Sequence, residues 1–120
     1  MSARTWRTVC PSDALVEGGD GVRFEARVQG GVEPAFVVRF DGGVHAYVNR
    51  CRHIPVELDW QPGRFFDDSG LYLVCSVHGA LYDAQNGLCV SGPCRGRSLV
   101  ALPARESDGS VQVEQESEDE

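Results

Sequence analysis

Short runs of alternating apolar and polar residues, separated by glycine-rich turns, follow one another along the chain. Val22 to Val28 place apolar side chains at every second position, which is the pattern of a half-buried β-strand. Ala35 to Phe40 and Val44 to Val48 predict two more strands, and Asp41-Gly42-Gly43 between them is a hairpin signal. The same reasoning predicts short strands at residues 71–74, 81–83, 88–90, 99–102 and 110–113.

No stretch of the sequence shows a sustained helical period. The best candidate is one turn around Ser12 and Asp13, with Ser12 as its cap. Fourteen glycines and six prolines also favour turns over long helices. We therefore predict an all-β, antiparallel fold in a single domain covering residues 1–113. Residues 114–120 carry five acids in seven positions, and we expect them to form a disordered acidic tail.

Charge and composition limit the partners and the compartment. The net charge of −7 argues against nucleic acid and against anionic membrane surfaces as partners. The N-terminal segment is polar, and no apolar run approaches the length of a signal peptide or a membrane span. These features predict a cytoplasmic protein, in which cysteine thiols stay reduced. Five cysteines are an odd number, so metal ligation is favoured over a disulfide scaffold.

Cysteine and histidine occur together in two short motifs. Cys51-Arg52-His53 follows one predicted strand and Cys75-Ser76-Val77-His78 follows another, so a sheet can hold the two loops side by side. Two thiolates and two imidazoles suit a tetrahedral zinc ion. They also suit a Rieske-type 2Fe–2S cluster, in which one iron takes both cysteines and the other takes both histidines. Because zinc motifs usually pair like with like, the mixed motifs favour the cluster.

With these residues the sequence resembles the Rieske family. The resemblance rests on Cys51-x-His53 and Cys75-x-x-His78-Gly79, followed by Tyr82-Asp83, Gly87 and Gly92-Pro93. It implies three antiparallel sheets with two cluster-binding loops, and a 2Fe–2S cluster held by Cys51, His53, Cys75 and His78. It also implies that a third loop, Ser91 to Cys94, covers the cluster. The 21 residues between His53 and Cys75 exceed the common family spacing, and we expect the excess to form a surface hairpin around Gln61-Pro62-Gly63.

The resemblance also predicts the reduction potential. High-potential members of the family carry a disulfide between the positions that correspond to Val56 and Val77. They also carry a serine at the position of Ala80, and its hydroxyl group donates a hydrogen bond to the cluster. Both features are missing here, whereas Tyr82 remains as a hydrogen-bond donor. The oxidised centre is neutral and the reduced one is negative, so fewer donors leave the reduced state less stabilised. We expect a potential at the low end of the Rieske range, roughly −150 mV.

These features predict a soluble, low-potential Rieske ferredoxin, which is an electron-transfer protein and not an enzyme. The ligand set leaves no open coordination position, and the chain has no room for a catalytic iron domain. We expect it to carry single electrons from a flavin-dependent reductase to a terminal oxygenase by transient docking. The alternatives are a Rieske subunit or accessory module of a larger redox enzyme, such as a nitrite-reductase small subunit, and a zinc-stabilised binding module.

Two further cysteines remain open at the level of sequence. Cys89 and Cys94 form either a small disulfide or two buried thiols, and a reducing compartment favours thiols. Their spacing would suit a plant-type ferredoxin, but the next position that such a motif requires is Arg97. His45 is expected to be a plain strand residue, since the four-ligand set is complete without it.

Overall fold

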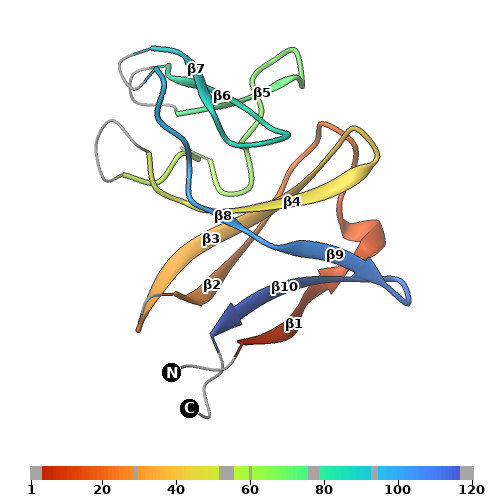
Figure 1. Cartoon of the computed structure of the whole chain (residues 1–120). Helices are drawn as coiled ribbons and strands as arrows, with labels where there is room; N and C mark the ends of the chain where they lie inside the picture. The colour runs from red at the N-terminus through yellow and green to blue at the C-terminus, as the bar shows by residue number, and fades with distance from the viewer. Residues whose placement is uncertain are drawn as a thin grey trace.

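Three antiparallel sheets are stacked along the molecule (Figure 1). The computed structural model describes residues 4–28, 30–51, 56–59, 61–75, 79–92 and 95–116. Within these ranges the chain forms ten β-strands and one turn of 3-10 helix. The predicted all-β fold with three antiparallel sheets is therefore confirmed. In the described part of the chain, no helix has the length and apolar character needed to cross a membrane.

The two ends of the chain meet in one sheet, the lowest in Figure 1. Its central strand β10 (Ser110–Glu116) pairs with β1 (Arg4–Pro11) on one side and with β9 (Ala104–Ser107) on the other. Neither β1 nor β9 is predicted by the pattern of apolar residues, because most of their side chains are exposed or only half-buried. Both strands therefore depend on their pairing with β10.

Two expected boundaries are corrected here. Strand β10 runs to Glu116 and buries Gln115 to 4 % exposure, so residues 114–116 belong to the sheet and not to a disordered tail. Residues 117–120 of that predicted tail lie outside the described residues. The predicted helical turn is present as η1 (Ser12–Ala14), but Pro11 occupies its cap position and no side chain caps it.

The middle sheet has the strand order β2-β3-β4-β8. Its strands are β2 (Val22–Val28), β3 (Gly31–Phe40), β4 (Gly43–Val48) and β8 (Ala101–Leu102). The first three confirm predicted strands, with β3 beginning four residues earlier than expected. The hairpin between β3 and β4 turns at Asp41 and Gly42, whose φ angles of 54° and 78° match the left-handed pair that a tight hairpin needs.

The third sheet consists of three short strands in the order β5-β6-β7. They are β5 (Tyr72–Val74), β6 (Leu81–Asp83) and β7 (Cys89–Ser91), each within one residue of its predicted bounds. This sheet lies above the middle sheet in Figure 1, at the opposite end from the two chain termini. The second cysteine–histidine motif begins at this end of the molecule, since Cys75 directly follows β5.

Two hydrophobic cores lie on either side of the middle sheet. Strand β3 supplies both, because successive side chains of a strand point to opposite faces. Phe36 and Val38 belong to the cluster beneath the third sheet, which we call the upper core. Ala35 and Val37 belong to the lower core, over the sheet that joins the termini. All four side chains are at most 1 % exposed, so β3 is covered on both faces.

The segment before β5 differs from the expected surface hairpin. The turn at Gln61-Pro62-Gly63 is present, because the Arg64 N–H donates to the Gln61 carbonyl oxygen at 2.9 Å. However, Leu58 and Phe65 on either side of the turn are fully buried. Phe65 stacks on Phe36 with ring centroids 3.9 Å apart. Leu58 and Phe65 thus anchor this segment in the upper core, while Gln61, Pro62 and Arg64 at the turn are exposed.

Candidate metal centre

The first motif begins where β4 leads out of the middle sheet. Cys51 is 4 % exposed, and its backbone N–H donates to the Val56 carbonyl oxygen at 2.8 Å. This bond closes a loop of residues 51–56 at its base, which we call the first loop. Val56 packs against the upper core. His53, the predicted second ligand of this motif, lies outside the described residues.

The second motif begins at Cys75, directly after β5, and this cysteine is fully buried. Its N–H donates to the Ala80 carbonyl oxygen at 2.9 Å, which closes the second loop, residues 75–80, in the same way as the first. Val77 and the predicted ligand His78 lie outside the described residues. Cys51 and Cys75 both belong to the upper core, so the structure brings the two predicted thiolate ligands into one buried cluster.

Tyr82 connects the third sheet to the first loop. It lies in the middle of β6, is fully buried, and pairs with Leu73 of β5 and Cys89 of β7. Its hydroxyl oxygen is 3.3 Å from the Cys51 sulfur. A deprotonated cysteine can only accept this bond, so the tyrosine hydroxyl is then the donor. The contact places the Tyr82 hydroxyl beside the proposed site, and its role as a donor to the cluster ligand stays a prediction.

The beginning of the third loop packs tightly on the second loop. Gly92 has a φ of 108°, and a Cβ at this position would be 2.9 Å from the Ala80 Cα. Only glycine allows both the backbone conformation and this close approach. Ala80 itself is fully buried and offers no hydroxyl group. Pro93 and Cys94, the rest of the predicted covering loop, lie outside the described residues.

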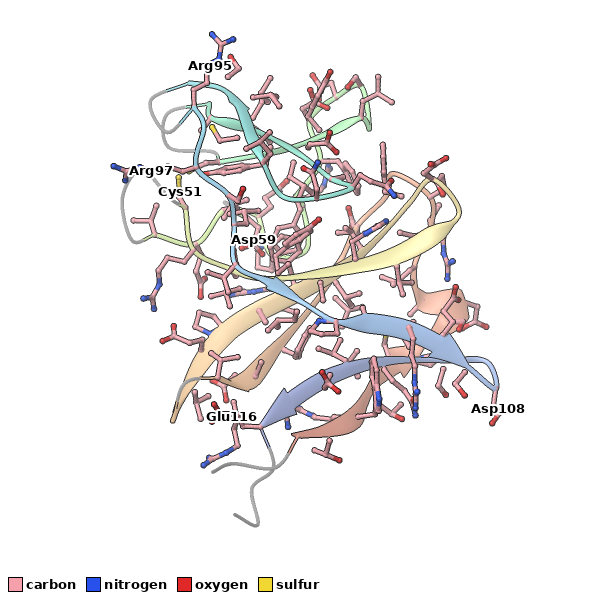
Figure 2. All side chains as sticks on the ribbon, viewed as in Figure 1. Cys51, Asp59, Arg95, Arg97, Asp108 and Glu116 are labelled. Atoms are coloured by element: carbon pink, nitrogen blue, oxygen red, sulfur yellow. The ribbon has the colours of Figure 1, made fainter. Side chains whose placement is uncertain are left out.

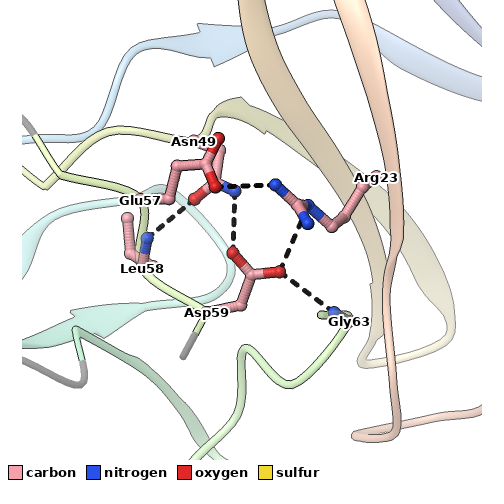
Figure 3. A network of polar contacts seen from close by, with 6 residues as sticks. All are labelled: Arg23, Asn49, Glu57, Leu58, Asp59 and Gly63. Atoms are coloured by element: carbon pink, nitrogen blue, oxygen red, sulfur yellow. Dashed lines mark hydrogen bonds and ion pairs between the residues drawn. The ribbon is translucent and has the colours of Figure 1, made fainter. Parts of the chain in front are cut away.

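A buried polar network supports the base of the first loop (Figure 3). The Asn49 side-chain amide donates to Asp59 at 2.9 Å, while its oxygen accepts the Leu58 N–H at 2.8 Å. The second carboxylate oxygen of Asp59 accepts the Gly63 N–H at 3.0 Å. The Asp59 side chain is fully buried, and Arg23 of β2 reaches to within 3.4 Å of it.

This network fixes the chain on both sides of the first loop. Asn49 precedes Cys51 by two residues, and Asp59 follows the end of the loop. A buried carboxylate is costly unless it is paired and hydrogen-bonded, and Asp59 has both kinds of partner. The apolar pattern does not reveal Asn49 and Asp59, because buried polar residues look like loop residues in a sequence. The only available signal is an asparagine and an aspartate flanking a cysteine motif.

The remaining predicted residues of this region are placed as follows. Cys89 is buried, and its sulfur lies 3.4 Å from the Ser91 carbonyl oxygen. Because Cys94 is outside the described residues, the choice between a disulfide and two thiols stays a prediction. His45 lies in β4 with a ring nitrogen 3.3 Å from the Phe40 carbonyl oxygen, which agrees with a strand residue outside the site.

The described residues fit the thiolate half of an iron–sulfur site. Two cysteine sulfurs are buried in one cluster, each at the start of a loop that a backbone bond closes, and a hydroxyl group contacts one of them. Burial and hydrogen bonds to sulfur are the means by which a protein tunes such a site. Among the described residues no group of three His, Cys, Asp or Glu side chains could hold a metal ion, and the two motif histidines fall outside that part.

Comparison with known proteins gives one family. The model of the Rieske [2Fe-2S] domain matches residues 5–112. No curated protein sequence matches the chain. Many solved structures do match it, and the first of them is a fluorene-bound oxygenase and ferredoxin complex of carbazole 1,9a-dioxygenase, at 23 % identity and a TM-score of 0.73. That match covers 90 % of this chain but 28 % of the matched one, so this chain spans less than a third of its length.

Two matched structures have nearly the same length as this chain. One is the ferredoxin of carbazole 1,9a-dioxygenase from Nocardioides aromaticivorans IC177, at 26 % identity and a TM-score of 0.68, covering 91 % of this chain and 96 % of that one. The other is the Sphingomonas yanoikuyae B1 ferredoxin, at 24 % identity and a TM-score of 0.70, covering 92 % and 99 %. Both likenesses agree with the three-sheet fold described above.

Proposed function

This chain belongs to the Rieske [2Fe–2S] domain family, and we propose that it is a small ferredoxin that carries single electrons. The observation that carries the proposal is the pair of buried sulfurs, Cys51 and Cys75, at the starts of two similarly closed loops in one core cluster. The likeness of the fold to two ferredoxins, at TM-scores of 0.68 and 0.70, supports the same conclusion. The protein acts as an electron carrier and not as an enzyme.

The proposed ligands are Cys51 and Cys75 for one iron, and His53 and His78 for the other. With these four residues as ligands no coordination position would stay open, so the cluster would supply one-electron chemistry without binding substrate. The chain buries the sulfurs, places the Tyr82 hydroxyl 3.3 Å from the Cys51 sulfur, and holds both loops at their bases. With alanine at position 80 and valine at position 56, we place the potential at the low end of the Rieske range, roughly −150 mV.

The proposed partners are a flavin-dependent reductase as the electron donor and a terminal oxygenase as the acceptor. The support is that matched proteins are ferredoxins and ferredoxin–oxygenase complexes of carbazole 1,9a-dioxygenase. We further propose a cytoplasmic location, because the buried Cys10 thiol and the two sulfur ligands suit a compartment in which cysteines stay reduced.

The test is the spectrum and the potential of the purified protein. We expect a red-brown protein containing iron and sulfide, a reduced-state EPR signal with the low average g value of mixed histidine and cysteine ligation, and a titrated potential below zero. His78→Cys should shift that signal and lower the potential, because a second negative ligand disfavours the reduced state. A colourless protein that contains zinc would contradict the proposal and select the zinc-stabilised module.

A second candidate is a Rieske module within a larger redox enzyme, of which a nitrite-reductase small subunit is one example. The observation that favours it is the match to the terminal oxygenase of carbazole 1,9a-dioxygenase from Novosphingobium sp. KA1, at 28 % identity over 90 % of this chain. Affinity purification from the native source, followed by size-exclusion chromatography, distinguishes the two candidate functions. A carrier elutes as a small protein, whereas a module co-elutes with another chain in fixed ratio.

A further inference from the structure

We propose that Arg95 and Arg97 form a positively charged docking surface beside the proposed cluster site, and that this surface recognises an acidic surface on the redox partner. The protein as a whole is acidic, so the proposal concerns a local charge of opposite sign. The inference rests on the proposed function as an electron carrier and adds the charge type of the partner. The two residues are called the arginine rim below.

The charge of the chain is unevenly distributed along its length. Residues 49–100 contain five arginines and five acidic residues and are therefore neutral, so the remaining residues carry the whole net charge of −7. The chain contains no lysine, so all eleven of its Lys or Arg positions are arginines. Arginine forms planar, two-pronged hydrogen bonds with carboxylates and is the residue type suited to recognising an acidic surface.

The backbone ties the arginine rim to the second loop. The Arg97 carbonyl oxygen accepts the Cys89 N–H at 2.7 Å, and the Gly96 N–H returns to the Cys89 carbonyl oxygen at 3.1 Å. The Arg95 N–H donates to the Gly92 carbonyl oxygen at 3.2 Å. Gly92 in turn lies against Ala80, at the base of the second loop. The rim is therefore held on a tight turn next to one of the two proposed ligand loops.

The arrangement of charges in space agrees with this connectivity (Figure 2). Arg95 and Arg97 lie at the same end of the molecule as Cys51, whereas Asp108 and Glu116 lie at the opposite end. Both side chains of the rim are exposed. Arg23, Arg39 and Arg50 form ion pairs with glutamates, but no carboxylate among the described residues forms an ion pair with Arg95. The Arg95 guanidinium is thus available to a docking partner.

Local charge decides docking at physiological ionic strength. The Debye length is about 8 Å at 0.15 M salt, and the molecule extends over 39 × 30 × 22 Å. A partner that approaches Arg95 and Arg97 is therefore screened from the acidic strands at the other end, and the charges nearest to it decide the interaction. An acidic face on that partner is attracted, although the net charges of two acidic proteins would repel each other.

The experiment uses the reduced holoprotein and small inorganic oxidants as probes of local charge. The reduced cluster gives one electron to hexacyanoferrate(III), which becomes hexacyanoferrate(II), and stopped-flow absorbance gives the rate constant. Salt is raised from about 0.1 M to about 1 M, a range in which only charges within about 10 Å of the oxidant act on it. We expect the rate with this anion to fall by a factor of about 3, and the rate with the cation hexaamminecobalt(III) to rise.

A double variant and a matched control assign the effect to the rim. Arg95→Gln with Arg97→Gln should abolish the fall with salt while the EPR signal stays unchanged. Arg7→Gln with Arg105→Gln removes the same charge from the sheet at the other end and should keep the fall. A hexacyanoferrate rate that rises with salt, or a rim variant identical to the unaltered protein, overturns the inference. A protein without a reducible cluster fails earlier, in the EPR measurement, and overturns the proposed function instead.

Discussion

The Tyr82 hydroxyl and the Cys51 sulfur lie 3.3 Å apart in a core from which water is excluded. A donor at this position stabilises the reduced state, in which the site carries more negative charge, more than the oxidised state. We predict that Tyr82→Phe lowers the reduction potential by about 20–60 mV, the one-electron equivalent of about 0.5–1.5 kcal/mol for one hydrogen bond. Redox titration followed by absorbance or EPR measures the change.

Tyr47 provides the control for that variant. It is also a buried tyrosine, but its hydroxyl donates to the Ala84 carbonyl oxygen at 2.7 Å. Burial, together with the negative charge of Asp83, raises the pKa of Tyr47 well above its ordinary value, so the hydroxyl remains a donor. Tyr47→Phe should lower the stability and leave the potential unchanged. Equal shifts of potential in both variants would show that the Tyr82 effect is general loosening of the core.

Gly92 allows a second prediction at the residue scale. Gly92→Ala should destabilise the fold by more than about 1 kcal/mol, because a Cβ would be 2.9 Å from the Ala80 Cα in addition to the positive φ. Gly96→Ala is the matched control, since Gly96 also has a positive φ but a Cβ there meets no atom within 4 Å. Urea denaturation gives the difference between the two variants. A cost no greater than that of Gly96→Ala would contradict the tight packing of the third loop.

At the scale of elements, Arg39 of β3 connects the middle sheet to the sheet that joins the termini. Its guanidinium donates to both carboxylate oxygens of Glu106 in β9, at 3.0 and 2.7 Å, and to the Leu15 and Ser12 carbonyl oxygens. The bond from Arg39 holds the pKa of Glu106 below its ordinary value of 4.5. The ion pair therefore contributes its full stabilisation above about pH 4.5, the ordinary pKa of a glutamate. This stabilisation is lost as the pH falls through the lower pKa that Glu106 has in the folded protein.

The free energy of unfolding falls as the pH is lowered from about 5 to about 3. We predict that this fall is smaller in Glu106→Gln than in the unaltered protein, by less than about 1 kcal/mol because the ion pair is partly exposed to solvent. Thermal unfolding temperatures recorded across this pH range measure the effect. Glu25→Gln, on an exposed position of β2, serves as the control. If both variants follow the acid dependence of the unaltered protein, the pair does not contribute in the folded state.

Strands were predictable where one face alternates between apolar and polar residues. Val22–Val28 has that pattern and forms β2 with the expected bounds. Strands β1 and β9 lack it, because pairing with β10 rather than a buried face places them in the sheet. That Cys51 and Cys75 come together was also predictable, because each of them follows a predicted strand. The Asn49–Asp59 network was not, since a buried polar pair depends on tertiary contacts that leave no periodic signal.

At the scale of the whole molecule, the first and last strands are neighbours. Arg4 pairs with Glu116 and Trp6 with Glu114, so the two chain ends are held together. The three residues 114–116, assigned to a tail by composition, also bond elsewhere. Glu114 donates its N–H to the Pro103 carbonyl oxygen, the Gln115 side chain accepts the Arg27 N–H at 3.2 Å, and the Glu116 side chain accepts the Gly30 N–H at 2.9 Å. Composition alone could not reveal this, because Gln115 is buried by a strand that lies far away in the sequence.

Truncation tests how the molecule closes. A chain that ends at Val113 loses the last three residues of β10, including the bonds of Glu114 and Gln115, and we predict a loss of about 2–4 kcal/mol in the free energy of unfolding. A chain that ends at Glu116 keeps them and should unfold at the same urea concentration as the full chain. The EPR signal should be unchanged in both, because the cluster end is distant from this sheet (Figure 1). If the two truncated chains were equally stable, residues 114–116 would not contribute to the stability of the fold, and the prediction would be wrong.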